Sequence, residues 1–280
     1  MNKPQEFKNQ RSFGPKPNYP LVNCYEHLNK DFIIISGSCS VENENQVYES
    51  ASKVAAAGAT HLRGGVFRAG TYPKKDAHFG WVETDLIKSF YEAAKLFNLK
   101  NIIEVLDYSL ESLEIIAPLA DCFQVGARSM QNYSLLRKLG EYKKPVFLKR
   151  NTGATVDEWL GAAEHLLLGG VKELYLIERG SSTFHNDVRW TPCLHVIPSV
   201  KSICNIPVIV DASHSTGRRD LVESITYAGV AAGAGGVLIE AHSDPKNSLS
   251  DPEQAIHIDR LPVILKNIKK IRQAIKPEEF

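Results

Sequence analysis

Residues 145–180 read PVFLKRNTGATVDEWLGAAEHLLLGGVKELYLIERG, and this stretch contains one complete strand–helix–strand unit. The runs PVFLKR and ELYLIE have the length of buried strands, and neither alternates regularly between apolar and polar residues. Continuous apolar runs are typical of parallel strands, because both faces of a parallel sheet are covered. The segment between them has the amphipathic pattern of a helix and ends at two glycines. The stretch therefore predicts a parallel α/β fold.

The same unit recurs along the chain. Eight apolar runs follow one another at a steady interval, at residues 32–37, 60–65, 101–106, 122–127, 145–150, 173–178, 207–212 and 236–241. Amphipathic segments lie between them, and a last one closes the chain. This repetition fits a (β/α)8 TIM barrel of class α/β better than an open sheet. We expect a single catalytic barrel over residues 32–280, with residues 1–31 as an N-terminal extension that caps the barrel bottom.

The overall composition argues against several classes of protein. The formal net charge is +1, which gives no general attraction to nucleic acid or to a membrane surface. The five cysteines are an odd number without C-x-x-C spacing, which favours a reducing compartment over a disulfide framework. The polar, proline-rich N-terminus does not resemble a signal peptide, and no apolar run reaches the length of a membrane span. We expect a cytoplasmic protein without an organic cofactor, because no dinucleotide or phosphate-loop motif occurs in a suitable context.

Four side chains that bind transition metals lie near the ends of predicted strands. They are Cys39 after the first strand, His214 after the seventh, Glu240 in the eighth and Asp251 just beyond it. The carboxyl ends of barrel strands meet on one face, where active sites form. A thiolate, an imidazole and two carboxylates predict a site there for Mn²⁺, Fe²⁺, Co²⁺ or Zn²⁺, with His242 as a supporting residue. Each residue alone has a simpler interpretation, as an apolar cysteine, a structural histidine or the partner of an arginine.

Basic residues form a second group at the same predicted face. They follow or end four of the five strands from the second to the sixth, and they are Arg63, Arg68, Arg128, Lys149 and Arg179. A single arginine is usually a solvated surface charge, but cations after successive strands predict an anion-binding cavity. This excess of charge indicates a substrate with several negative groups, such as a small phosphorylated carboxylic acid. Lys149 could instead act as a Schiff-base lysine, although the neighbouring arginines favour a phosphate or carboxylate contact.

The chain also contains long, specific motifs between residues 32 and 256. They include GSCSVE, LRGGVF, QVGARSMQNYSLL, PVFLKRNTGATVDEWLGAAEH, ERGSSTF, PVIVDASHSTGRR and IEAHSDP. These motifs resemble the type I 3-deoxy-7-phosphoheptulonate (DAHP) synthases, and less closely the related 3-deoxy-octulosonate 8-phosphate synthases. The resemblance implies a barrel enzyme, a transferase that condenses phosphoenolpyruvate (PEP) with erythrose 4-phosphate in the shikimate pathway of aromatic amino acid biosynthesis. It also implies a homodimer or homotetramer.

The resemblance implies roles for the residues named above. An essential divalent metal would be bound by Cys39, His214, Glu240 and Asp251. PEP would be held by its carboxylate and phosphate through Arg63, Arg128, Lys149 and Arg179, with Arg68 in place of a family lysine. Glu104 would face the same pocket. We therefore expect the catalytic residues to be Lys149, His214, Cys39 and Glu104.

The segment RAGTYP, which begins at Arg68, departs from the resembled family. That family carries a KPRTS-type motif, whose arginine and threonine bind the phosphate of the acceptor. Gly70 stands in place of the arginine, and a lost charge-assisted contact costs roughly 10²-fold in affinity. The expected acceptor-binding residues are therefore Thr71, Lys74, Lys75 and Asp251. The two lysines fit a solvated loop equally well.

Three functions are compatible with the sequence. The first is a DAHP synthase. The second is a paralogue that uses PEP with a different, non-phosphorylated aldehyde, and Gly70 keeps this alternative open. The third is a non-catalytic regulator that binds PEP or a metal on an inactive barrel, although the complete set of four metal-binding residues argues against it.

Overall fold

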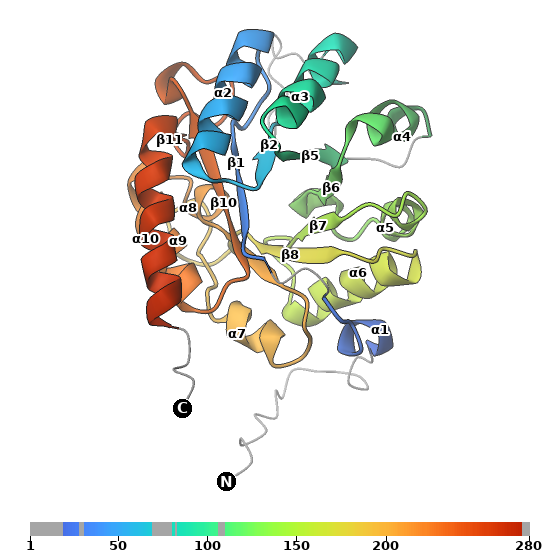
Figure 1. Ribbon diagram of the computed structural model, residues 1–280. Coiled ribbons are helices and arrows are strands. Elements are labelled where there is room, and N and C mark those ends of the chain that lie inside the picture. Colours follow the sequence, from blue (N-terminus) through green and yellow to red (C-terminus); the bar gives the residue numbers. More distant parts are fainter. Residues whose placement is uncertain (1–18, 28–30, 69–79, 82, 106–109, 276–280) are drawn as a thin grey trace.

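The structure is a computed structural model that describes residues 19–27, 31–68, 80–81, 83–105 and 110–275. Among these residues, eight parallel strands form a closed barrel (Figure 1), which confirms the predicted (β/α)8 fold. They are β1 (Ile33–Gly37), β2 (His61–Arg63), β5 (Lys100–Val105), β6 (Cys122–Val125), β7 (Val146–Lys149), β8 (Leu174–Glu178), β9 (Val208–Asp211) and β10 (Gly236–His242). The strands pair in chain order, and β10 pairs with β1 to close the ring.

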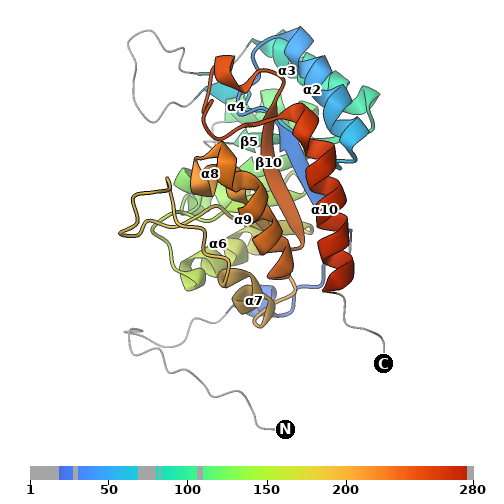
Figure 2. The same cartoon turned by 90° about the vertical axis from the view of Figure 1, so that its left-hand side faces the viewer.

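Helices follow most of the strands and cover the outside of the barrel (Figures 1 and 2). The longer ones are α2 (Glu44–Ala57), α3 (Thr84–Leu96), α4 (Leu110–Ile116), α5 (Tyr133–Gly140), α6 (Val156–Leu168), α9 (Arg219–Ala231) and α10 (Leu261–Ala274). Local signals fix their ends. Thr155 and Glu158 form a reciprocal capping box at the start of α6, and α2 ends at Gly58, whose φ is 96°.

Shorter elements complete the described chain. Residues 179–195 form a long loop between β8 and the short helix α7 (Val196–Lys201), and α8 (Ala212–Thr216) follows β9 directly. Strands β3 (Phe67–Arg68) and β4 (Gly80–Trp81) pair antiparallel to each other, and β11 (Ile256–His257) pairs with β10. The 3₁₀ turns are η1 (Ala117–Leu119), η2 (Ala127–Ser129), η3 (Pro245–Asn247) and η4 (Ile258–Arg260).

The interior of the barrel is apolar over most of its height. One buried cluster fills it, formed by Ile33, Ile35, Ile102, Cys122, Phe147, Tyr175, Ile177, Ile209 and Leu238. The rings of Phe147 and Tyr175 stack with their centres 4.5 Å apart. Side chains along a strand alternate between its two faces, so the residue two positions later points the same way. At that position the chain becomes polar, as in the pairs Phe147 and Lys149, Ile209 and Asp211, and Leu238 and Glu240.

The described part of the N-terminal extension contacts α6 and the amino ends of the strands. Helix α1 (Pro20–Asn23) lies beside α6, where Glu164 accepts hydrogen bonds from two backbone N–H groups of α1. The hydroxyl of Tyr25 accepts from the first backbone N–H of β8 at 2.8 Å. The ring of His27 lies edge-on to Tyr175, with 4.8 Å between the ring centres.

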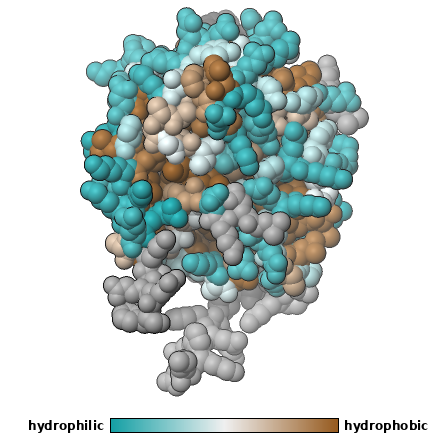
Figure 3. Space-filling view, in the orientation of Figure 1, coloured by the Kyte–Doolittle hydropathy of each residue, from teal (hydrophilic) through white to brown (hydrophobic). Residues whose placement is uncertain are grey.

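Hydrophilic residues make up much of the described surface in the view of Figure 3. Hydrophobic residues show there in separate places between hydrophilic ones. Scattered exposed hydrophobic side chains of this kind are normal on a globular protein. None of the described helices is both long and apolar enough to cross a lipid bilayer.

Candidate active site

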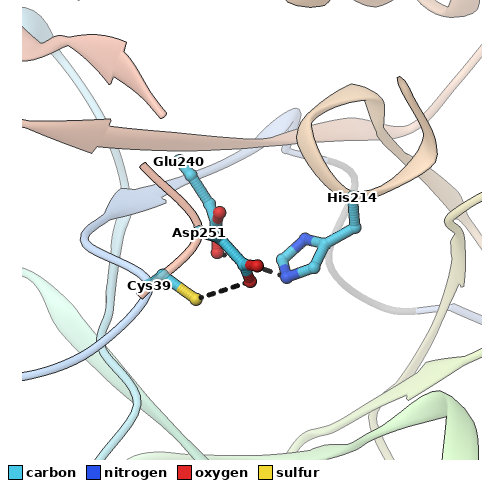
Figure 4. Close-up of side chains that lie close together, drawn as sticks. All are labelled: Cys39, His214, Glu240 and Asp251. Carbon is cyan, nitrogen blue, oxygen red and sulfur yellow. Dashed lines mark hydrogen bonds and ion pairs between the residues drawn. The ribbon is translucent and has the colours of Figure 1, made fainter. Parts of the chain in front are cut away.

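Four side chains from separate segments point toward one another at the carboxyl ends of the strands (Figure 4). Cys39 follows β1, His214 lies on α8, Glu240 lies in β10, and Asp251 lies in the loop after β10. One potential ligand atom of each lies within 4.8 Å of the other three. Nε2 of His214 is 3.2 Å from Oε1 of Glu240, and Sγ of Cys39 is 3.3 Å from Oδ2 of Asp251. Ligands of a tetrahedral metal, with bonds of about 2.0–2.3 Å, lie about 3.3–3.7 Å apart, so this group has suitable spacing.

Two glycines allow the ends of β1 and β2 to approach each other. Gly37 has a φ of 141°, and a Cβ there would lie 2.0 Å from the carbonyl oxygen of Arg63. A Cβ at Gly65 would lie 2.5 Å from the carbonyl oxygen of Cys39. A larger residue therefore fits neither position without moving the backbone. The glycines of the GSC and RGG motifs bring Cys39 and Arg63 to the same place.

A buried carboxylate, Asp211, fixes the orientation of His214. Asp211 caps the start of α8, and its Oδ1 accepts from the backbone N–H of His214 at 3.0 Å and lies 3.0 Å from Nδ1. A metal bound at Nε2 would therefore leave the imidazole proton on Nδ1, facing Asp211, as in most metal-binding histidines. Burial acts to raise the pKa of Asp211, but the charges of His214 and Lys149 hold that pKa well below its usual range.

Glu240 is fully buried and is held by charged and polar neighbours. Nη1 of Arg63 donates to Oε1, and Nε2 of Gln254 donates to Oε2. Burial acts to raise the pKa of Glu240, but the charges of His214 and Arg63 outweigh it and place the pKa below the ordinary value. Glu240 is thus the partner of an arginine, and the same carboxylate also faces His214. The two interpretations that the sequence left open for Glu240 are compatible.

Cys39 and Asp251 complete the group from two loops. Sγ of Cys39 lies 3.4 Å from the hydroxyl of Ser250. Burial, followed by the negative charge of Glu240, raises the pKa of Cys39 well above its ordinary value. The sulfur is therefore a thiol unless a cation stabilises the thiolate, which is what a bound metal does. Asp251 has a φ of 47°, a left-handed conformation that aspartate tolerates better than most residues.

Cations surround the same end of the barrel. Lys149, at the end of β7, is 4% exposed, and its Nζ lies 3.2 Å from Oδ2 of Asp211. Arg179, directly after β8, is 8% exposed, and its guanidinium lies 5.7 Å from the centre of a Trp190 ring. Within the described part of the chain, Arg179 has no ion pair. Arg128 lies on η2, directly after β6, and is exposed. A buried cation without a counter-ion is costly, so this arrangement favours an anionic ligand.

Other expected site residues differ in how far the structure describes them. The side chain of Arg68, and all of Thr71, Lys74 and Lys75, lie outside the described residues. Glu104, in β5, accepts a hydrogen bond from Nε2 of Gln124 at 2.8 Å. A Cβ at Gly126 would lie 2.2 Å from Oε1 of Glu104, so the glycine of the GAR motif leaves the space that this carboxylate occupies.

The sequence reasoning misses several residues that contact the group of four, among them Asp211, Gln254 and Arg189. A signal for Asp211 exists, because an acid three residues before the histidine in DASH has the spacing of a helix N-cap. Gln254 and Arg189 have no such signal, since their contacts depend on how two loops fold over the strand ends. His242, expected to support the ligands, instead has its Nε2 3.4 Å from Oε1 of Glu42.

Most of the chain matches a known protein family. The family model described as the DAHP synthetase I family matches residues 25–277. The chain belongs to this family. It is an enzyme of the DAHP synthase type, as the sequence motifs predict. The match covers all eight barrel strands.

Individual members of the DAHP and octulosonate families support the assignment. The phospho-2-dehydro-3-deoxyheptonate aldolase of Thermotoga maritima is 35% identical over 265 residues, which are 95% of this chain and 77% of that protein. Its crystal structure superposes with a TM-score of 0.82 over 88% of this chain and 71% of that one. The structure of a truncated form of the Thermotoga maritima synthase superposes with a TM-score of 0.79 over 88% of each chain, at 34% identity. The 2-dehydro-3-deoxyphosphooctonate aldolase of Geobacter sulfurreducens is 27% identical over 60% of this chain and 65% of that protein.

Proposed function

We propose that this enzyme condenses PEP with erythrose 4-phosphate to give DAHP and inorganic phosphate, at a metal centre formed by Cys39, His214, Glu240 and Asp251. One observation carries the proposal. Four potential metal-binding side chains converge beside nearly buried cations at the carboxyl ends of the barrel strands, among them Lys149 and Arg179. The relatives named as DAHP synthases, at 35% identity, support the same reaction. A homodimer or homotetramer belongs to the same proposal, and light scattering on the purified protein tests it.

The donor set fits a divalent transition metal. A thiol and an imidazole favour Mn²⁺, Fe²⁺, Co²⁺ or Zn²⁺ over Mg²⁺ and Ca²⁺, which prefer all-oxygen sites. The contact between Asp211 and His214 orients the imidazole, and Arg63 keeps Glu240 ionised, so two of the ligands are already in a binding form. Such an ion supplies Lewis acidity toward an aldehyde oxygen when it is bound.

PEP carries a carboxylate and a phosphate, so it requires several cations. Lys149 and Arg179 suit this task, because both are nearly buried at the strand ends. Arg63 and Arg128 lie at the same end, and Arg68 joins them by its place in the sequence. A guanidinium can hold a phosphate or a carboxylate through two parallel hydrogen bonds. The same groups stabilise the negative charge that accumulates on the phosphate as it leaves.

The proposed reaction forms one carbon–carbon bond and breaks one carbon–oxygen bond. C3 of PEP bonds to the aldehyde carbon, and the aldehyde oxygen takes up a proton to become a hydroxyl. Water adds to C2 and loses a proton; the C2 hydroxyl then gives up its proton to the leaving phosphate as the C2=O bond forms and the bond from C2 to the phosphate oxygen breaks. The role of the cations is to hold PEP so that C3 faces the aldehyde. We assign proton transfer during water addition to Glu104, whose carboxylate is positioned by Gln124.

A second candidate function is supported by Gly70, which offers no side chain to bind an acceptor phosphate. In this alternative the enzyme uses PEP with a non-phosphorylated aldehyde. A panel of aldehydes, with and without a terminal phosphate, separates the two when phosphate release is measured in the presence of PEP and Mn²⁺. Erythrose 4-phosphate as the best substrate supports the first function. A non-phosphorylated aldehyde as the best substrate supports the second, and no turnover with any aldehyde contradicts both.

A further inference from the structure

Arg189 is built into the fold next to the group of four, although it lies in the long loop between β8 and α7. Its backbone N–H donates to the carbonyl of Thr216 at 2.9 Å, and that of Trp190 donates to the carbonyl of Ser215 at 2.7 Å. The loop is thereby attached to α8, the helix that carries His214. Gly217, with a φ of 64°, makes room for the arginine, because a Cβ there would lie 2.7 Å from Cβ of Arg189.

The guanidinium of Arg189 lies at the solvent side of the group. Nη1 donates to Oδ1 of Asp251 at 3.4 Å and to Oε1 of Gln254 at 3.2 Å. No described residue accepts a hydrogen bond from Nε or Nη2 of Arg189. Side-chain exposure rises from 0% at Glu240 to 12% at His214, 36% at Asp251 and 38% at Arg189. The group of four therefore opens to solvent beside Arg189, and a second substrate entering there meets the unused donors of this guanidinium.

A deeper cation, Arg179, lies beside the residue that follows Arg189, with its guanidinium 5.7 Å from the centre of a Trp190 ring. Burial lowers the pKa of Arg179; Asp211 opposes this shift, and the charge of Arg189 adds to it. Like charges this near each other favour ligands with separate negative groups, one for each cation. PEP uses the inner, nearly buried cations in the function proposed above. The outer cation then remains for a negative group on the other substrate.

We propose that Arg189 binds the terminal phosphate of the acceptor aldehyde and so determines the preference for a phosphorylated acceptor. This inference rests on the proposed PEP condensation. Arg189 is separated from the expected metal position by only one carboxylate, that of Asp251. A short sugar chain can span this separation with its aldehyde near the metal and its phosphate on the guanidinium. Gly70 cannot supply a side-chain cation, whereas Arg189 is a described, partly exposed cation beside the group of four.

The test compares phosphorylated and non-phosphorylated forms of one acceptor in Arg189→Gln and Arg189→Lys. Turnover is measured with erythrose 4-phosphate and erythrose, and binding of the unreactive probes erythritol 4-phosphate and erythritol is measured by calorimetry on the protein loaded with Mn²⁺ and PEP. We expect Arg189→Gln to raise the KM for erythrose 4-phosphate and the Kd for erythritol 4-phosphate by about 10- to 100-fold. Constants for erythrose, erythritol and PEP should change less than threefold. Arg189→Lys should recover part of the loss, because it keeps the charge without the planar fork.

A matched control is Arg218→Gln. Arg218 is a nearby arginine whose guanidinium is paired with Asp220 at 2.6 Å, and this variant should behave as wild type with all four probes. If Arg189→Gln weakens the binding of the phosphorylated and non-phosphorylated probes equally, or weakens the binding of neither, the inference is wrong. Equal weakening would mean that Arg189 acts only through Asp251 and Gln254. Absence of turnover by wild type with every aldehyde would contradict the proposed function, while the calorimetric comparison would still decide the role of Arg189.

Discussion

Two layers of the barrel interior come from the same strands but have opposite chemistry. In the lower layer, Phe147 stacks on Tyr175 within an apolar cluster. Two positions further along β7 and β10, the upper layer contains Lys149 and Glu240, both charged and nearly or fully buried. Burial of a charge costs solvation free energy, and even a paired charge returns little of it to stability. The lower layer therefore serves the fold, whereas the charged pairs of the upper layer contribute little to stability and lie where we expect ligands to bind.

This difference predicts that the effects of substitution are separable. Changes in the lower layer should reduce the free energy of unfolding and leave ligand affinity nearly unchanged. Changes in the upper layer should weaken ligand binding and leave the free energy of unfolding nearly unchanged. Some of them should even stabilise the protein, as is common when a functional site is altered. The following substitutions test this separation, from the largest expected effect to the smallest.

Removal of the metal should have the largest effect. We expect Cys39→Ala, or treatment of wild type with a chelator, to lower kcat/KM by about 10⁴-fold, since a Lewis acid supplies several kcal/mol of transition-state stabilisation. Addition of Mn²⁺ should restore the chelated wild type but not the variant. Cys193→Ala is the control, because Cys193 is also partly buried and lies outside the group of four. A metal-free Cys39→Ala protein with full activity would rule out the metal centre.

Phe147→Ala tests the lower layer. Phe147 is fully buried against Tyr175, and loss of such a ring costs about 3–5 kcal/mol in the free energy of unfolding. Urea denaturation measures this loss, and the affinity for Co²⁺ should stay within a few-fold of wild type. Phe184→Ala is the control, because Phe184 is 92% exposed and its removal should change stability very little. A large loss of Co²⁺ affinity in a folded Phe147→Ala protein would contradict the separation of the layers.

His61, in the lower layer, makes the stability of the protein depend on pH. It lies edge-on to Phe147, and burial, with a smaller contribution from Lys100, lowers its pKa to about 4. In the unfolded chain the imidazole of His61 takes up a proton at about pH 6.5, whereas in the folded chain it does so only near pH 4. Protonation therefore favours the unfolded chain, and stability is lost as the pH falls through this range. The loss from this residue reaches about 3 kcal/mol at the acid end. His61→Phe should flatten the pH dependence of urea unfolding between these values, and an unchanged slope would contradict the assignment.

Arg179→Gln tests the anion-binding part of the upper layer. Loss of a nearly buried guanidinium should raise the KM for PEP by about 10²-fold, with a smaller change in kcat. Stability should be equal to or higher than that of wild type, because the variant no longer buries a charge without an ion pair in the described residues. Arg260→Gln, which removes an exposed partner of Glu223, is the control. An unchanged PEP dependence would show that Arg179 does not contact PEP.

Asp211→Asn should have the smallest effect on ligand binding. Asparagine keeps the shape of the side chain but loses the charge that holds His214 and Lys149. Substitution of such a supporting carboxylate usually lowers metal affinity by about 10- to 100-fold. A Co²⁺ titration measures the change, and Asp220→Asn, at an exposed aspartate near the start of α9, serves as the control. Equal Co²⁺ affinity in wild type and Asp211→Asn would show that Asp211 does not support metal binding through His214.

The fold and much of the site follow from patterns that one sequence can show. Each apolar run predicts a strand because a parallel barrel buries both faces of its strands, and the residue at the end of each run then has a known location. Cys39 and Glu240 were found in this way. Arg189 and Gln254 could not be, because their positions depend on the fold of two loops that share no periodicity. The pairing of Arg63 with Glu240 was also hidden, since the sequence does not reveal which of several arginines a buried carboxylate contacts.

The most direct test of the account is a Co²⁺ titration of the metal-free protein in the presence of PEP and erythrose 4-phosphate. Thiolate-to-cobalt charge-transfer absorption and the rate of PEP consumption are followed in the same samples. We predict that both signals rise together and level off at one Co²⁺ per chain, and that Cys39→Ser abolishes the absorption along with most of the rate. PEP consumption that is complete before Co²⁺ is added, or that continues unchanged in Cys39→Ser, would contradict the claim that the strand-end group is the metal centre of the reaction.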